Sequence, residues 1–339
     1  MGIMNKWVKR VGIGVGALIG VVLLAGGGFS AWAVTTFEGR QQFPDVARPE
    51  LKASTDPAVI AAGKYLVHGP AHCSQCHSTT DRDHPEKVKD APLKGGLEFA
   101  MGPIATTYAP NLTPHETGLG KFSDADIARV IRTGVRPDGS LSFFMTMAAS
   151  KPSDEDVIAI ISYLRSLEPI ANPVPAGEWK PLGKIIFSLA SIGPVSDPPP
   201  KHVPPAEEPS VERGRYLSKS IMLCSSCHTK FDMGSLKSVG PEAGGSLPDQ
   251  SHGKDSDKEF VAPNLTSDPT GITGRMDEAA FVARLKAGRA FASSIMPWEG
   301  FQSATESDLK SVYRYLKSLP PVKNDVGPTY RDVGWKPPQ

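Results

Sequence analysis

The sequence contains one succession of short motifs twice, in the same order. Gly-Lys-Tyr-Leu at residues 63–66 returns as Gly-Arg-Tyr-Leu at 214–217, and Ala-Pro-Asn-Leu-Thr at 109–113 returns at 262–266. In each copy, a Cys-x-x-Cys-His motif lies between these two motifs. It occupies residues 73–77 and, 151 residues later, residues 224–228. A repeat of this length predicts two domains of the same fold joined in tandem.

The Cys-x-x-Cys-His spacing is the one that attaches a c-type haem. Two thiols three positions apart reach the two vinyl groups of one porphyrin, and the next residue places an imidazole under the iron. All four cysteines of the chain belong to these motifs. We therefore predict two covalently bound haem c groups, held by Cys73, Cys76 and His77 in the first copy and by Cys224, Cys227 and His228 in the second.

Two other chemistries use paired cysteines. A Cys-x-x-Cys pair can be a thiol redox site, and four thiolates can hold one structural zinc ion. Neither requires a histidine directly after each second cysteine, and the two pairs lie farther apart in the sequence than those of a zinc ribbon. The haem interpretation accounts for more of the pattern.

The second axial ligand of each iron decides whether the metal is closed or open to substrate, and a methionine thioether closes it. Met296 precedes Pro297 and Trp298. Met145 stands at the same distance after the first cysteine of its own motif, and Met147 is the alternative ligand in that copy. Core packing is the alternative role for these methionines. Pro110 and Pro263 are candidates to accept the N–H of the ligating imidazoles, although each could simply form a turn.

Each copy is expected to be all-α. A first helix leads into the haem motif, a middle helix spans 124–133 or 277–287, and a last helix begins at Ser153 or Thr305, where hydroxyl caps precede acidic residues. We place the domains at residues 55–182 and 208–338. A proline-rich linker at 183–207 joins them, and its apolar stretch beginning at residue 184 is predicted to be a short helix or strap.

The start of the chain, residues 1–37, is a membrane anchor or a signal segment. Lys6, Lys9 and Arg10 precede an uncharged stretch from 11 to 37. Residues 31–33 (Ala-Trp-Ala) offer a cleavage site, but the length of the stretch favours a retained, single transmembrane helix. The positive residues place the amino terminus in the cytoplasm. The haem domains are then expected in the periplasm, on the outer face of the inner membrane.

The charge of the chain limits its partners. The net charge is +1 and there is no basic tract, so we do not expect the protein to bind nucleic acid. Electron transfer requires no acid–base pair of side chains, and we identify no catalytic residue in the sequence.

These motifs resemble tandem class I cytochrome c domains, and specifically bacterial membrane-anchored dihaem cytochromes c. The similarity is greatest to the cytochrome c subunits of periplasmic alcohol, aldehyde and sugar-acid dehydrogenases, and it covers most of residues 55–182 and 208–338. One departure is Thr146, which follows Met145 where the second copy has proline. The resemblance implies an electron-transfer protein of the respiratory chain, working between a dehydrogenase or quinol-oxidising complex and a downstream acceptor or terminal oxidase.

The alternative function is a dihaem redox enzyme of the peroxidase or thiosulfate-oxidising type. Such an enzyme needs at least one iron with an open or labile position. Matched methionines in the two copies argue for two closed irons, and therefore for a carrier that is not itself an enzyme.

Overall fold

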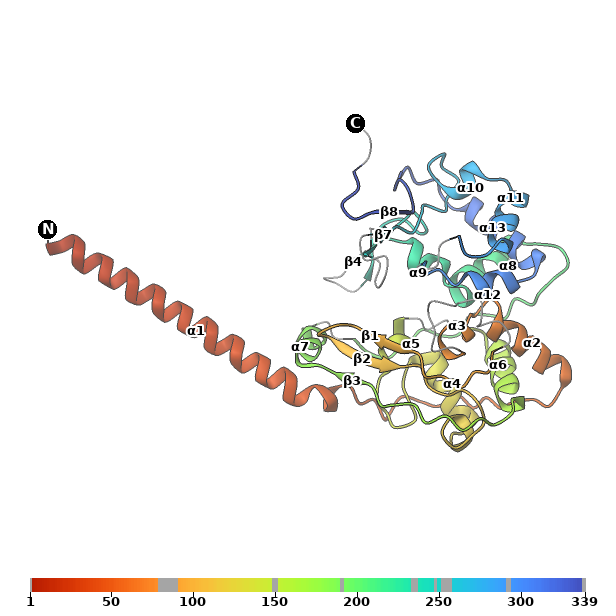
Figure 1. The fold of residues 1–339 in the computed structure, drawn as a ribbon, viewed down its shortest axis with the longest axis horizontal. Helices are drawn as coiled ribbons and strands as arrows, with labels where there is room; N and C mark the ends of the chain where they lie inside the picture. Colours follow the sequence, from red (N-terminus) through yellow and green to blue (C-terminus); the bar gives the residue numbers. More distant parts are fainter. Residues whose placement is uncertain are drawn as a thin grey trace.

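The computed structural model describes residues 2–78, 91–147, 152–189, 192–232, 237–246, 249–250, 258–290 and 294–336. A long helix projects from a body of two stacked lobes (Figure 1). We call residues 41–189 the N-terminal lobe and residues 210–336 the C-terminal lobe. Helices make up most of the regular structure, as the sequence predicts.

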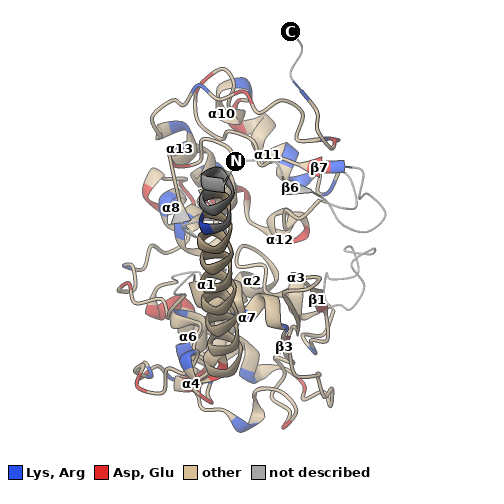
Figure 2. Cartoon of the chain, turned by 90° about the vertical axis from the view of Figure 1, so that its left-hand side faces the viewer, with Lys and Arg blue, Asp and Glu red and all other residues tan. Residues whose placement is uncertain are grey.

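The projecting helix is α1 (Gly2–Arg40). Its segment Arg10–Arg40 is long and apolar enough to cross a membrane, judged by length and composition alone. Figure 2 shows this helix as an almost uninterrupted uncharged rod. Most of its described side chains are exposed, but Ala33 and Phe37 near its end are buried, where α1 meets α7 (Pro181–Leu189).

The N-terminal lobe is built on the packing of α2 (Pro57–His68) against α6 (Asp154–Ser166). Gly63 lies at this contact. A Cβ atom added to Gly63 would lie 1.9 Å from the carbonyl oxygen of Ala159 and 2.8 Å from Cβ of Tyr163. The helices approach so closely that only a residue without a side chain fits between them.

The C-terminal lobe repeats this packing with α8 (Val211–Tyr216), the π-helix η3 (Leu217–Ile221) and α13 (Glu306–Ser318). Here the contact is at Gly214. An added Cβ would lie 1.9 Å from the carbonyl oxygen of Ser311 and 2.8 Å from Cβ of Tyr315. The equality of the two sets of distances shows that the sequence repeat is also a structural repeat.

Side-chain caps define the starts of the predicted middle and last helices. The middle helix α4 (Asp124–Thr133) has the predicted bounds, a capping box between Ser123 and Asp126, and a left-handed Gly134 at its end. The last helices begin after the predicted caps Ser153 and Thr305. The remaining helices are α3 (Ser74–His77), η2 (Leu119–Lys121), α5 (Phe143–Met147), α9 (Cys224–His228), α10 (Ile272–Arg275), α11 (Glu278–Lys286) and α12 (Trp298–Ser303).

The described residues also contain three small antiparallel sheets, which the all-α expectation did not include. Each strand has two to four residues, too few for an alternating pattern to appear in the sequence. The sheets are β1–β2–β3 (Glu98–Ala100, Ala105–Tyr108, Glu178–Trp179), β4–β5 (Phe231–Asp232, Lys237–Ser238) and β6–β7–β8 (Asp249–Gln250, Lys258–Phe260, Tyr330–Asp332).

The short helix expected in the apolar stretch of the linker is α7, and it begins at Pro181, before the predicted linker starts. It packs on the N-terminal lobe. A Cβ on Gly183 would lie 2.1 Å from the carbonyl oxygen of Ile104, and the Phe187 ring contacts those of Phe143 and Trp179 at centroid distances of 4.7 and 4.8 Å. This end of the linker is therefore part of the N-terminal lobe.

The two lobes contact each other through equivalent residues. The Tyr65 hydroxyl of α2 donates a hydrogen bond to Asp308 Oδ2 of α13 (2.7 Å) and accepts one from the Thr305 backbone N–H (3.1 Å). In the opposite direction, the Tyr216 hydroxyl donates to Asp156 Oδ2 and accepts from the Ser153 N–H. Each tyrosine thus enters the start of the other lobe's last helix. Such reciprocity is the pattern of an isologous interface with a two-fold axis.

The two aspartates that accept the tyrosine hydrogen bonds have different basic partners. Asp308 forms a buried ion pair with Arg213 (Nε–Oδ1 2.9 Å). Asp156 lies 3.7 Å from Nδ1 of His202, which comes from the segment that connects the lobes. One apolar core continues through both lobes, from Leu66 and Leu164 in the first to Leu217 and Leu316 in the second. The lobes are therefore packed against one another rather than merely tethered.

Candidate functional site

The two Cys-x-x-Cys-His motifs form two short helices, α3 and α9. The residue before the first cysteine of each motif has left-handed backbone: φ is 43° at His72 and 56° at Leu223. Neither is glycine, so each position is held by its surroundings against a local conformational cost. The chain enters both motifs through the same sharp turn.

Each motif histidine has a fixed partner. Nδ1 of His77 lies 2.8 Å from the carbonyl oxygen of Pro110, and Nδ1 of His228 lies 2.8 Å from that of Pro263. A carbonyl can only accept, so Nδ1 carries the proton and donates. The lone pair of the neutral ring is then on Nε2, which is the atom available to a metal.

The proline carbonyls are held by a buried network that the sequence analysis did not identify. In the first copy, Asn111 Oδ1 accepts from the Thr113 backbone N–H (2.9 Å) and hydroxyl (2.8 Å), while Asn111 Nδ2 donates to the Ile170 carbonyl (2.8 Å). The second copy has the same bonds, from Thr266 to Asn264 (2.9 and 2.8 Å) and from Asn264 to the Val322 carbonyl (2.6 Å). The repeated Pro-Asn-Leu-Thr run was the signal for it.

The backbone returns to each histidine at a glycine. The Gly95 N–H donates to the His77 carbonyl (2.7 Å), and the Gly245 N–H donates to the His228 carbonyl (2.8 Å). Both glycines have positive φ, 70° and 97°. These turns bring the proline loop beside the imidazole in both lobes.

Burial sets the protonation of the site. Burial lowers the pKa of His77 and of His228, and it outweighs the opposing effect of the proline carbonyls. Both imidazoles are therefore neutral, as a metal ligand must be. Burial also raises the pKa of Cys73 and of Cys224 to about 12. A thiol redox site needs a lowered thiol pKa, so the raised pKa of these thiols argues against a thiol redox site.

The zinc alternative has no support in the described part of the chain. Cys73 directly precedes α3 and Cys76 lies on it, Cys224 and Cys227 lie on α9, and none forms a disulfide. No group of three or more His, Cys, Asp or Glu side chains among the described residues is arranged to hold a metal ion.

The two candidate methionines occupy different local structures. Met145 is partly exposed in the middle of α5, which contacts α4. Met296 is partly buried just before α12 and packs against the main core. Met147 is the last residue of α5, and its side chain lies outside the described residues.

The neighbourhood of Met296 contacts the first motif directly, because α12 packs on α2 and α3 (Figure 1). The Phe301 ring meets the ring of His72 edge-on at a centroid distance of 5.9 Å. A Cβ on Gly300 would lie 2.7 Å from the Gly69 carbonyl oxygen. The helix that follows Met296 therefore packs directly against the loop that precedes Cys73.

Comparison with known proteins identifies the class. Residues 60–168 match the family model of cytochrome c. Over 294 residues, 80% of the chain, it is 31% identical to the cytochrome c subunit of the quinone alcohol dehydrogenase of Gluconacetobacter polyoxogenes, and it spans 58% of that protein's length. It is 35% identical over 133 residues to the gluconate 2-dehydrogenase cytochrome c subunit of Pantoea cypripedii, covering 37% of this chain and 29% of that one.

A third relative is a dihaem cytochrome c-type protein of Cereibacter sphaeroides, 24% identical over 276 residues, which are 74% of this chain and 83% of the relative. The chain thus contains a cytochrome c domain, and the predicted similarity to cytochrome c subunits of dehydrogenases is confirmed. A cytochrome c domain implies covalently bound haem c, and the neutral His77 with its free Nε2, beside two cysteines, fits that group.

Proposed function

We propose that this protein is a dihaem c-type cytochrome that transfers electrons at the outer face of the inner membrane. The observation that carries the proposal is the equal geometry of the two motif histidines. Each donates from Nδ1 to a proline carbonyl at 2.8 Å. A functional site built twice with one geometry is what two haem groups of the same kind require.

The residues of each lobe have distinct roles in this proposal. The cysteines, Cys73 and Cys76 or Cys224 and Cys227, hold the porphyrin covalently. His77 and His228 are the proximal ligands, oriented by Pro110 and Pro263. Met145 and Met296 are the second axial ligands. When bound, each haem supplies a one-electron couple, and the protein supplies orientation and exclusion of water.

We further propose that residues 55–182 and 208–338 are two tandem class I cytochrome c domains, joined by the linker at 183–207. The family model matches within the first of these ranges. For the second, the support is structural: the contacts at Gly214, the bond from His228 to Pro263 and the network around Asn264 all repeat those of the first.

The proposal places the haem lobes in the periplasm, on a single retained anchor, α1. The candidate cleavage site at residues 31–33 lies inside a continuous helix, and Ala33 is fully buried. The length of the apolar segment, enough to cross a membrane as one helix, supports retention. The basic residues before the apolar stretch place its start in the cytoplasm.

The proposed electron donor is a dehydrogenase or quinol-oxidising complex, and the acceptor is a downstream carrier or terminal oxidase. Three relatives are cytochrome subunits of alcohol, gluconate and fructose dehydrogenases. The protein would then be the electron-carrying part of an oxidoreductase complex and not its catalytic part. Its donor should co-purify from native membranes.

The test is the mass of the denatured protein together with its reaction with carbon monoxide. A mass increased by two haem groups, with no carbon monoxide uptake by the reduced form, is the expected result. An increase of one group or none would overturn the dihaem proposal. Rapid carbon monoxide uptake would instead indicate an open iron and a dihaem redox enzyme.

A further inference from the structure

The helix α7 has an apolar stripe that no other part of the described chain covers. Leu182, Ile186 and Leu189 are 45, 42 and 70% exposed. They stand four and three positions apart, so they lie on one face of the helix. A neighbouring face, with Gly183 and Phe187, packs on the N-terminal lobe.

A third side of α7 is bound to the end of α1. Lys184 Nζ forms an ion pair with Glu38 at 2.8 Å, and the Arg40 guanidinium donates to the Ser188 hydroxyl. Two separate polar contacts thus fix α7 at the point where the apolar helix meets the lobe. The apolar stripe cannot turn inwards without breaking them.

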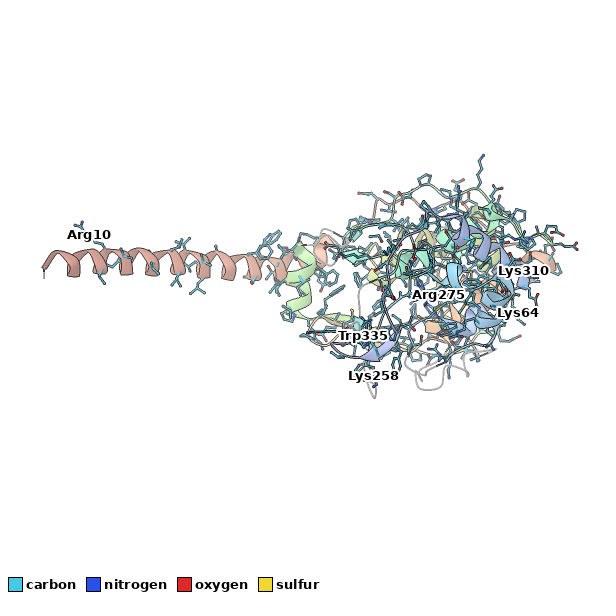
Figure 3. All side chains as sticks on the ribbon, turned by 90° about the horizontal axis from the view of Figure 1, so that it is seen from above. Arg10, Lys64, Lys258, Arg275, Lys310 and Trp335 are labelled. Carbon is cyan, nitrogen blue, oxygen red and sulfur yellow. The ribbon has the colours of Figure 1, made fainter. Side chains whose placement is uncertain are left out.

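The direction of α7 is crosswise to α1. Figure 1 shows α7 end-on at the side of the lobe from which α1 projects. Figure 3, seen from above, shows the same green helix crossing the foot of α1. If α1 runs along the membrane normal, α7 therefore lies parallel to the membrane plane, on the side of the lobe nearest to it.

The aromatic and basic residues at this end of α1 suit a membrane interface. Trp32 is 46% exposed, and the Arg40 guanidinium lies 4.3 Å from the centre of its ring. Tryptophan and arginine are typical of the boundary between hydrocarbon and water. The boundary that they indicate lies within two turns of the contact with α7.

We propose that α7 is an interfacial helix, with Leu182, Ile186 and Leu189 inserted among the lipids of the membrane that α1 crosses. The inference rests on the proposed anchoring by α1 and adds a second membrane contact. Two crossed helices, one through the bilayer and one on it, would fix the tilt of the N-terminal lobe. An interfacial helix buries its apolar face only about 5–10 Å deep, which side chains of this size can reach.

Lipid fits this stripe better than a protein partner. The stripe is one side chain wide and three long, and α7 contains no acidic residue that an anionic lipid surface would repel. A partner protein that used this face would have to displace the lipid surrounding the anchor.

The test uses the full chain, reconstituted in vesicles of phosphatidylcholine and phosphatidylglycerol. A carbene-generating probe dissolved in the lipid is photolysed, and tryptic peptides are analysed by mass spectrometry. Peptide 185–201 contains Ile186 and Leu189, and peptide 11–40 reports on α1. Peptide 290–310 contains Ile295, which is 74% exposed in the C-terminal lobe, and serves as the control.

We expect peptide 185–201 to be labelled several-fold above peptide 290–310. The double variant Ile186→Ser, Leu189→Ser should lose this labelling and retain that of peptide 11–40. Labelling of 11–40 with 185–201 at the control level would overturn the inference and leave the anchor intact. Absence of label from both peptides would overturn the anchor and the inference together.

Discussion

The Tyr65 hydroxyl of α2 donates to Asp308 at the start of α13, across the boundary between the lobes, over 2.7 Å. Its equivalent, Tyr216, donates to Asp156 in the opposite direction. Burial is the main reason that the pKa of both tyrosines is raised, and the nearby carboxylates add to it. Both phenols are thus permanent donors at physiological pH, and the two bonds lock one lobe to the other.

The first prediction concerns this lock. Tyr216→Phe leaves the buried carboxylate of Asp156 without its phenol donor, at a cost of about 2 kcal/mol, whereas Tyr65→Phe leaves Asp308 with its bonds to Arg213 and should cost less. Because both bonds cross the lobe boundary, the double variant should unfold in two calorimetric steps. Tyr163→Phe is the control, since Tyr163 bonds to His68 within one lobe (2.8 Å). Unfolding of the double variant in a single step would show that the apolar core alone couples the lobes.

The helix crossings give a second prediction. Gly63→Ala and Gly214→Ala each place a Cβ against a backbone carbonyl 1.9 Å away, and backbone cannot move aside as a side chain does. Each should reduce the free energy of unfolding by about 3 kcal/mol or more. Gly193→Ala, with no atom within 4 Å of the added Cβ, should change it by less than about 0.5 kcal/mol. Denaturant titration measures all three, and equal effects would contradict the steric argument.

A third prediction concerns the proline loops. Asn264→Asp replaces the Nδ2 donor, which bonds to the Val322 carbonyl at 2.6 Å, by an acceptor. The mismatch in a buried site should cost about 2–3 kcal/mol. Because Asn264 follows Pro263 directly, the Pro263 carbonyl that accepts from His228 should shift, and the redox potential of the proposed second haem should change with it. A potentiometric titration with only one altered midpoint is the expected result; two unchanged midpoints would separate the loop from the haem.

The axial ligands give a fourth prediction. Met145→Ala and Met296→Ala should each remove about half of the far-red band that iron–methionine ligation produces in the oxidised protein, because each methionine is proposed to close one iron. Each variant should also gain carbon monoxide binding. Met222→Leu is the control, since Met222 is buried in the core. Loss of the band in Met147→Leu, with Met145→Ala unaffected, would transfer the role to Met147.

A fifth prediction concerns acid pH. Burial acts to raise the pKa of Glu299, but the hydrogen bonds and charge of Arg289 (2.8 and 2.9 Å) outweigh it and lower that pKa. Ionised Glu299 therefore stabilises the fold above its unfolded-state pKa, about 4.3, and this contribution is lost as the pH falls through the lowered folded-state pKa.

Glu299→Gln should accordingly lower stability by about 2 kcal/mol at pH 7 and by much less in acid. Urea titrations between neutral and acid pH give the comparison. Glu306→Gln is the control, because Glu306 is exposed and its pair with Lys310 is a surface contact of 3.4 Å. A difference between Glu299→Gln and the wild type that stays constant with pH would contradict the argument.

Local signals in the sequence were enough to predict α4 and the starts of the two last helices. The cap at Ser123 and the glycine at 134 define α4 to the residue, and Ser153 and Thr305 begin the last helices as expected. These signals work because caps and left-handed glycines act on the chain within one helical turn.

The sequence could not predict features that depend on how distant segments meet. The short strands pair because loops lie side by side in the folded lobe, and α7 begins early because Gly183 fits against Ile104. The bonds of Tyr65 and Tyr216 depend on the placement of one lobe on the other. Within the site, the spacing indicated the cysteines and histidines, whereas the role of Asn111 and Asn264 was visible only once Ile170 and Val322 were seen beside them.

The reciprocal tyrosine contacts have a consequence for the history of the chain. Equivalent residues that bind each other in both directions are what a homodimer of one ancestral domain would have had before its gene was duplicated and fused. The later chain kept the dimer contact and let its two ends diverge, with Arg213 beside one aspartate and His202 beside the other. On this view the mutual arrangement of the two lobes is older than the polypeptide that now connects them.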